Sequence, residues 1–170
     1  MEVAKVPLVL LSLISYVVAL IILVNLVYAS DNTIAIQTKG SSTAISIDQS
    51  GTSNTTTVWC GLSGGTYATH SCSNATMTID QHGTSNTARA YSQLTNHNDN
   101  VYTINQNGNS NNGYIDLDDD DNVASISQTG NSNTGIIYMR GDDNVYTITQ
   151  TGNSFYAKMY AFGDDSAWAI

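Results

Sequence analysis

The stretch VYTITQTGNS, Val145–Ser154, occurs three times in nearly the same form at intervals of 22 residues. The other two copies are VYTINQNGNS at 101–110 and VASISQTGNS at 123–132. Two looser copies surround Gln49 and Gln81, which makes five in all. A repeat of this length is typical of proteins built from stacked units that each contact only their neighbours.

The five copies agree at four positions, which indicates a shared structural unit rather than biased composition. Each copy contains a glutamine, at Gln49, Gln81, Gln106, Gln128 and Gln150. Isoleucine stands two residues before it, at Ile47, Ile79, Ile104, Ile126 and Ile148. Glycine stands two residues after it, at Gly51, Gly83, Gly108, Gly130 and Gly152. Asparagine follows the glycine by three residues at Asn54, Asn86, Asn111 and Asn133, and Phe155 takes its place in the last copy.

The residues around each glutamine alternate with a period of two, which is typical of a β-strand. The glycine then predicts a turn, and Ala157, Met159 and Ala161 alternate in a second strand. We therefore expect an all-β solenoid of stacked strand–turn–strand units from residue 30 to 170. Full units begin at 43, 75, 100, 122 and 144, with a half unit at 32–42 and another at 166–170.

A buried glutamine or asparagine is costly unless its amide is hydrogen-bonded. A single hairpin cannot supply those bonds, whereas a stack of identical hairpins forms amide ladders between neighbouring units. The isoleucines, which recur two residues before each glutamine, supply the apolar side chains of the core. An ordinary β-sandwich or a disordered low-complexity chain would not need this strict spacing.

The frame Asn-x-Ala-x-Ile-x-Gln-x-Gly-x-x-Asn, as in NVASISQTGNSN at 122–133, resembles the repeat of curlin, the subunit of curli fibres. The resemblance covers residues 32–170 and implies a cross-β, amyloid-like subunit of an extracellular bacterial fibre that serves adhesion and biofilm matrix. It also implies an outer-membrane secretion pore and a nucleator subunit as partners. Curlin repeats usually carry a second glutamine, where this chain has Cys60, Ser92, Leu117, Met139 and Ala161. The predicted glutamine ladder is therefore one-sided.

The N-terminal segment differs from the rest. Lys5 precedes an apolar run at 6–24, and small or neutral residues stand before Ser30. This pattern predicts a signal peptide cleaved after Ala29. The run is also long enough for a retained membrane anchor, and this would be the chain's one contact with a membrane. Both alternatives predict a secreted protein. Export favours a disulfide between Cys60 and Cys72 over two unpaired thiols.

The two half units predict how copies could join. Asn32, Ile34 and Ile36 belong to a lone second strand, while Ser166, Trp168 and Ile170 belong to a lone first strand. Exposed strand edges invite association. We expect these complementary edges to join end to end, which would give an open homopolymer.

Aspartate pairs recur in the turns just before the units that begin at 122, 144 and 166. They are Asp120, Asp121, Asp142, Asp143, Asp164 and Asp165. This row is either a solvated edge or a site for Ca²⁺ or pH control, since Ca²⁺ prefers clustered oxygen ligands. The net charge of −9 argues against nucleic acid as a partner.

The sequence predicts no enzyme and no other cofactor, because His70, His82 and His97 share no ligand spacing and no nucleophile stands near a base. The alternative function is a monomeric binding module, either an adhesin or an ice-binding protein with a threonine column at Thr78, Thr103 and Thr147. Val101, Val123 and Val145 form either an exposed row or, with a β-bulge, part of the core.

Overall fold

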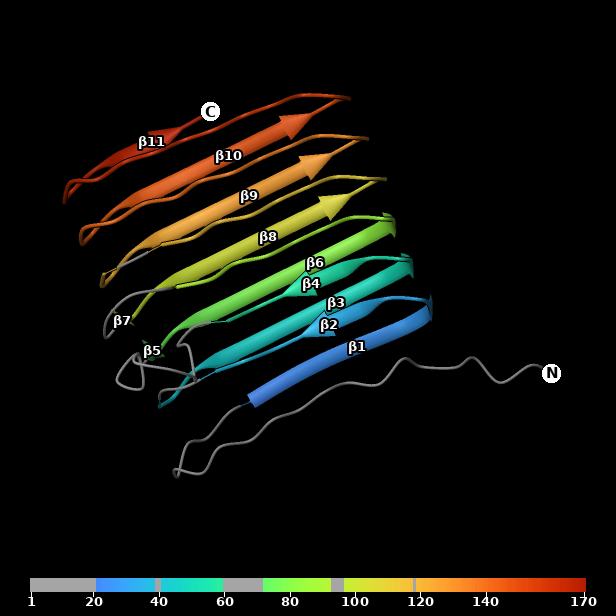
Figure 1. Cartoon of the computed structure of the whole chain (residues 1–170), viewed down its shortest axis with the longest axis horizontal. Helices are drawn as coiled ribbons and strands as arrows, with labels where there is room; N and C mark the ends of the chain where they lie inside the picture. Colours follow the sequence, from blue (N-terminus) through green and yellow to red (C-terminus); the bar gives the residue numbers. More distant parts are fainter. Residues whose placement is uncertain (1–20, 39–40, 60–71, 93–96, 118) are drawn as a thin grey trace, which may run out of the picture.

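The computed structural model describes residues 21–38, 41–59, 72–92, 97–117 and 119–170. Eleven strands occur in this part of the chain, and they are stacked in chain order from β1 to β11 (Figure 1). The strands are β1 Ile21–Ser30, β2 Thr33–Ala35, β3 Ala44–Thr52, β4 Thr55–Thr57, β5 Cys72–Ser73, β6 Thr76–Thr84, β7 His97–Asn98, β8 Val101–Asn107, β9 Val123–Thr129, β10 Val145–Thr151 and β11 Ala167–Ala169. The prediction of an all-β solenoid of stacked repeats is confirmed.

The first strand of every unit joins one parallel sheet of seven strands, in the order β1-β3-β6-β8-β9-β10-β11. Equivalent residues lie side by side along the stack. Ile104 pairs with Ile126, for example, and Gln106 pairs with Gln128. The repeat thus sets the register, because a slip of one residue would turn every isoleucine and glutamine away from the core.

The second half of each unit is less regular than the sequence predicts. The pairs β2–β4 and β5–β7 form short sheets, and the remaining units meet through single bridges such as Thr87–Asn112 and Asn112–Thr134. Non-glycine residues with positive φ interrupt the ladder, among them Ile115 (φ 110) and Tyr138 (φ 102). The second strand that the sequence predicts in each unit is therefore not continuous. Buried and exposed side chains still alternate there, except at the buried Asp116.

The core lies between these two faces and consists of columns of side chains. Isoleucines at 47, 79, 104, 126 and 148 are each at most 1% exposed. On the opposite side of the core, small residues face some of these large side chains. Ile104 lies over Gly113 and Ile126 over Gly135, where an added Cβ would come within 3.0 Å of the isoleucine side chain. Large and small residues thus pack against each other across the core.

The first strand of the stack comes from the segment that the sequence predicts as a signal peptide. β1 pairs in parallel with β3, from Ile21–Ala44 to Val27–Ser50, and then shifts register before Ser30. In this chain β1 therefore holds the first-strand position beside β2, which the sequence predicts as a lone second strand. Residues 1–20 of the predicted signal lie outside the described residues, and cleavage after Ala29 remains a prediction. No helix in the described ranges is long and apolar enough to cross a membrane.

Candidate functional site: amide ladders and stack edges

The glutamine side chains form one continuous hydrogen-bonded ladder through the core. The Nε2 of each glutamine except Gln150 donates to the Oε1 of the glutamine in the next unit. The Nε2–Oε1 distance is 2.7 Å between Gln49 and Gln81 and 2.8 Å between Gln81 and Gln106. It is 2.9 Å between Gln106 and Gln128 and 2.8 Å between Gln128 and Gln150. These side chains are 0–6% exposed, so the bonds are made in a medium where an unpaired amide would be costly.

The second hydrogen on most of these amides goes to the opposite face of the stack. Gln106 Nε2 donates to the carbonyl oxygen of Thr87 at 3.0 Å, and Gln128 Nε2 donates to that of Asn112 at 3.1 Å. The glutamines thus tie together both neighbouring units and both faces. The ladder ends at Gln49 Oε1, for which the described residues provide no partner.

The asparagines after the glycine turn form a ladder of a different kind. Their side chains bond to backbone rather than to one another. Asn111 Oδ1 accepts from the backbone N–H of Asn133 at 3.0 Å, and Asn111 Nδ2 donates to the carbonyl of Gly130 at 2.8 Å. Asn54, Asn86 and Asn133 repeat this pattern. This column therefore fixes the turn of one unit onto the turn of the next.

Two further asparagine columns were not among the site residues predicted from the sequence. Asn100, Asn122 and Asn144 lie buried before the first strands, and Asn122 N donates to Asn100 Oδ1 at 2.8 Å. Asn109, Asn131 and Asn153 are exposed in the glycine turn, and Asn131 N donates to Asn153 Oδ1 at 2.8 Å. The signal was present, because each column repeats at the interval of 22 residues, but only three units carry it.

The turn glycines stack directly on one another. Gly51, Gly83, Gly108, Gly130 and Gly152 all have positive φ, between 100° and 129°. A Cβ added at any of the first four would lie 2.0 Å from the carbonyl oxygen of the next glycine. The column is thus required by backbone contact between units, in addition to the turn conformation.

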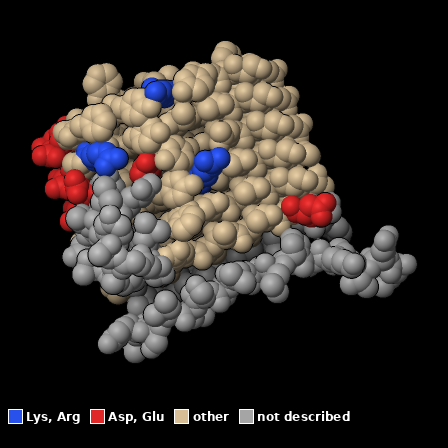
Figure 2. All heavy atoms as spheres, in the orientation of Figure 1, with Lys and Arg blue, Asp and Glu red and all other residues tan. Residues whose placement is uncertain are grey.

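The aspartate turns lie along one edge of the stack, where Figure 2 shows acidic side chains gathered. The first aspartate of a pair accepts a hydrogen bond from a backbone N–H of the neighbouring unit. Asp120 N donates to Asp142 Oδ1 at 2.8 Å, and Asp142 N donates to Asp164 Oδ1 at 3.2 Å. The second aspartates, Asp121, Asp143 and Asp165, have φ of 53–56° and are exposed. One aspartate of each pair therefore supports the stack while the other faces solvent near its equivalents.

Repulsion along this row predicts a pH dependence. Desolvation in the turn, followed by repulsion from Asp99 and Asp143, raises the pKa of Asp121 above its ordinary value. A carboxyl group whose pKa is raised by folding opposes folding when it is ionised, and this penalty disappears as the pH falls through the raised pKa. Asp121→Asn is expected to raise the thermal unfolding midpoint at neutral pH, because asparagine also tolerates positive φ. The two proteins should converge below the ordinary aspartate pKa of 3.8. An equal difference at both pH values would contradict this.

The structure adds no support for the calcium site that the sequence predicts at the aspartate turns. Among the described residues, no three His, Cys, Asp or Glu side chains are grouped so that they could hold a metal ion. Asp118, next to the row, lies outside the described part. Calcium at these turns remains a prediction.

Cys72 is buried and disulfide-bonded, and Thr43 Oγ1 lies 3.9 Å from its sulfur. Cys60, the residue that the sequence pairs with it, lies outside the described residues. His70 also lies outside them.

The two ends of the stack differ. At the C-terminal end, β11 pairs with β10 through Ala167, Trp168 and Ala169. Trp168 and Ile170 are 66% and 60% exposed, whereas Ser166 is partly buried. At the N-terminal end, Asn32 is buried and Asn32 Oδ1 accepts from Asn54 N at 2.8 Å, while Ile34 and Ile36 pack against the core. The structure thus places the predicted edge residues at opposite ends.

The outer face of the seven-stranded sheet keeps strict alternation. Val123 and Val145 are 37% and 46% exposed, and Tyr102 and Tyr146 beside them are buried. No bulge reverses the two sides in β8, β9 or β10, so the three valines lie in a row on the outer face, where Val101 is partly buried. Thr78, Thr103 and Thr147 lie in one register, with Ser125 between the last two.

One comparison with known proteins finds a match. Residues 120–166 match the family model of the curlin associated repeat. This confirms the resemblance to curlin that the repeat frame indicates. No curated protein and no solved structure matches the chain.

Proposed function

We propose that this protein is a secreted subunit that polymerises end to end into a curli-like amyloid fibre at the bacterial cell surface. The main support for this proposal is the in-register parallel stack, in which every unit binds its neighbour through the glutamine ladder. A contact of this kind has no built-in limit, so the same bonds that join units within a subunit can join subunits. The match to the curlin associated repeat supports the same function.

The C-terminal edge supports addition of another copy. The last unit exposes large apolar side chains that no further unit covers, with Phe155 51%, Tyr156 65% and Trp168 66% exposed. In the inner units the equivalent positions are more buried, as at Asn133 (0%) and Tyr146 (1%). A second copy that adds strands at this edge would bury this apolar surface, which favours association.

The N-terminal edge supplies the complementary element. β2 lies in the second-strand position and β11 in the first-strand position, so together they would form one composite unit. In the present chain β1 lies on the edge of β3 that β11 of another copy would use. Removal of β1 by cleavage after Ala29 would open this edge.

Export through an outer-membrane pore, a nucleator that starts the fibre, and a role in adhesion and biofilm matrix are proposed from the resemblance alone. A structural role also agrees with the proposal that the protein is not an enzyme.

Deletion of residues 166–170 tests the proposal. This change removes β11 and leaves β3, β6, β8, β9 and β10 intact, so the subunit should still fold. We expect the critical concentration for filament growth to rise at least about tenfold, which corresponds to roughly 1.4 kcal/mol per added subunit. Electron microscopy and dye-binding kinetics measure growth, and circular dichroism measures folding.

Val123→Thr provides the matched control, because it alters an exposed side chain away from both edges. It should form filaments as the unaltered protein does. Filament growth that is unchanged by the deletion would refute the proposed joint. An unaltered protein that stays monomeric at high concentration would favour a monomeric binding module instead.

A further inference from the structure

A row of aromatic side chains crosses the outer face formed by the second half of each unit. It consists of Trp59, Tyr91, Tyr114, Tyr138 and Tyr160, one from each of five consecutive units. The ring centroids of successive members are 6.0, 5.4, 5.4 and 4.5 Å apart. Neither the core nor the proposed joint between subunits uses this row. It therefore offers a continuous surface of aromatic carbon along the stack.

The row is completed by a residue from a different repeat position. In the third unit Asp116 occupies the position equivalent to Tyr91 and Tyr138, and Tyr114 comes from two residues earlier. Asp116 is only 6% exposed, and the Tyr114 hydroxyl donates to Asp116 Oδ2 at 3.0 Å. Burial and the adjacent Asp116 carboxylate raise the pKa of Tyr114, so its hydroxyl remains protonated near neutral pH. This bond holds the Tyr114 ring in the row.

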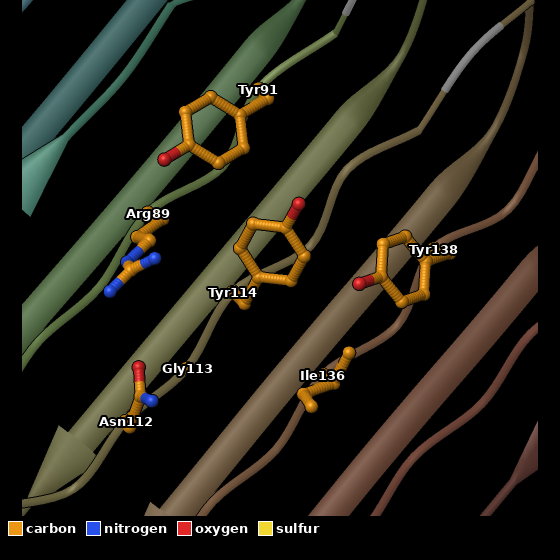
Figure 3. A pocket seen from close by; sticks show the side chains of 7 residues that line it. All are labelled: Arg89, Tyr91, Asn112, Gly113, Tyr114, Ile136 and Tyr138. Carbon is orange, nitrogen blue, oxygen red and sulfur yellow. The ribbon is translucent and has the colours of Figure 1, made fainter.

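A shallow pocket of about 440 Å³ opens on the row at its centre. Figure 3 shows Arg89, Asn112 and the rings of Tyr91, Tyr114 and Tyr138 around it. The pocket combines aromatic carbon with hydroxyl and amide groups and with one guanidinium group. Arg89 is exposed, and the described residues give its guanidinium no hydrogen-bond or ion-pair partner. The pocket thus presents an uncompensated cation among stacking surfaces.

The charge on this face is opposite to that of the turn edge. Arg89, Arg140 and Lys158 are the basic residues within the described ranges, and all three follow the glycine turns, in the second half of their units. Figure 2 shows basic side chains on this face and acidic ones mainly at its edge. Lys158 Nζ lies 4.2 Å from the centre of the Tyr160 ring. An anionic ligand is therefore favoured here although the whole chain is acidic.

We propose that this face binds an acidic polysaccharide, a chain of sugar rings that carry carboxylates. Arg89 would hold a carboxylate through paired N–H donors, a geometry that guanidinium groups favour. The aromatic rings would pack against the apolar C–H faces of the sugars, and the Asn112 amide and tyrosine hydroxyls would bond to sugar hydroxyls. A polymer fits because the aromatic row runs from unit to unit.

Two other occupants fit less well. Single-stranded nucleic acid also stacks on aromatic rings, but it needs a groove of basic residues along its phosphates. The three basic residues described on this face, in a chain of net charge −9, do not supply such a groove. A second copy packed face to face would bring the same basic residues together, which is unfavourable. The polysaccharide is thus the occupant that both the rings and the charge favour.

Titration calorimetry on the full chain tests the site, with an oligomer of uronic acid as the probe and a chelator present to exclude calcium bridging. A neutral glucan oligomer and a single-stranded oligonucleotide are the comparison ligands. Arg89→Gln should weaken uronate binding at least tenfold, and Arg89→Lys should restore only part of it. Tyr114→Ala should weaken binding of both saccharides. Val123→Thr, on the opposite face, should bind as the unaltered protein does.

Three results would overturn the proposal. They are uronate binding that is absent, uronate binding that Arg89→Gln and Tyr114→Ala leave unchanged, and oligonucleotide binding that is tighter than uronate binding. Thermal unfolding of each variant separates loss of the site from loss of the fold. Arg89→Gln should still form filaments by electron microscopy, because Arg89 lies away from both edges. Failure of the site and failure of the fibre proposal are therefore distinguishable.

Discussion

Replacement of Gly130 by alanine is expected to break the stack between the fourth and fifth units. Gly130 has φ of 115°, and a Cβ there would lie 2.0 Å from the Gly152 carbonyl oxygen and 2.8 Å from its carbon. The obstacle is backbone, so no side-chain movement relieves it. The cost should exceed about 3 kcal/mol, which combines backbone strain with displacement of the next turn. Chemical denaturation of the two proteins measures this difference.

Gly163→Ala is the matched control for this experiment. Gly163 lies in a turn of the last unit, where an added Cβ meets nothing within 4 Å. Alanine there should leave the free energy of unfolding nearly unchanged, within about 0.5 kcal/mol. If both substitutions had the same small effect, the close stacking of the glycine column would not matter for stability.

Replacement of Gln106 by leucine is expected to have the second-largest effect. Gln106 accepts from Gln81 Nε2 at 2.8 Å and donates to Gln128 Oε1 at 2.9 Å. Leucine removes both ladder bonds and the bond from Gln106 Nε2 to the Thr87 carbonyl. It leaves two buried groups of the ladder, Gln81 Nε2 and Gln128 Oε1, short of a partner. At about 1–3 kcal/mol for each such group, the loss should be about 2–6 kcal/mol. It is measured as the change in the denaturation midpoint at constant slope.

Two variants distinguish a ladder effect from a general packing effect. Gln150→Leu, at the end of the ladder, breaks one ladder bond, from Gln128, where Gln106→Leu breaks two. Each substitution also removes one bond to a carbonyl of the opposite face, so Gln150→Leu should cost about half as much. Asn105→Ser changes an exposed side chain on the same strand as Gln106 and should be nearly neutral. Equal losses at Gln106 and Gln150 would indicate that bonds between neighbouring amides do not set the stability.

Much of the candidate assembly site follows from the repeat. A glutamine with an isoleucine two residues before it alternates to the same side of a strand, so both side chains face the core. The ladder through Gln81, Gln106 and Gln128 follows, because only a neighbouring copy can satisfy a buried amide. The asparagines were predicted as ladder residues too. Their choice of backbone groups, such as the Gly130 carbonyl, depends on turn geometry that the pattern does not contain.

The sequence alone thus determined that the chain stacks in register, because its period and its buried amides have no other common solution. The tertiary structure alone decided what the outer faces present. Positive φ at Ile115 and Tyr138 makes the second half of each unit irregular. Tyr114 therefore joins Tyr91 and Tyr138 although it lies two residues out of step. Periodicity fixes the side of the strand on which a residue lies, whereas contacts across units depend on backbone dihedral angles that only the packed stack sets.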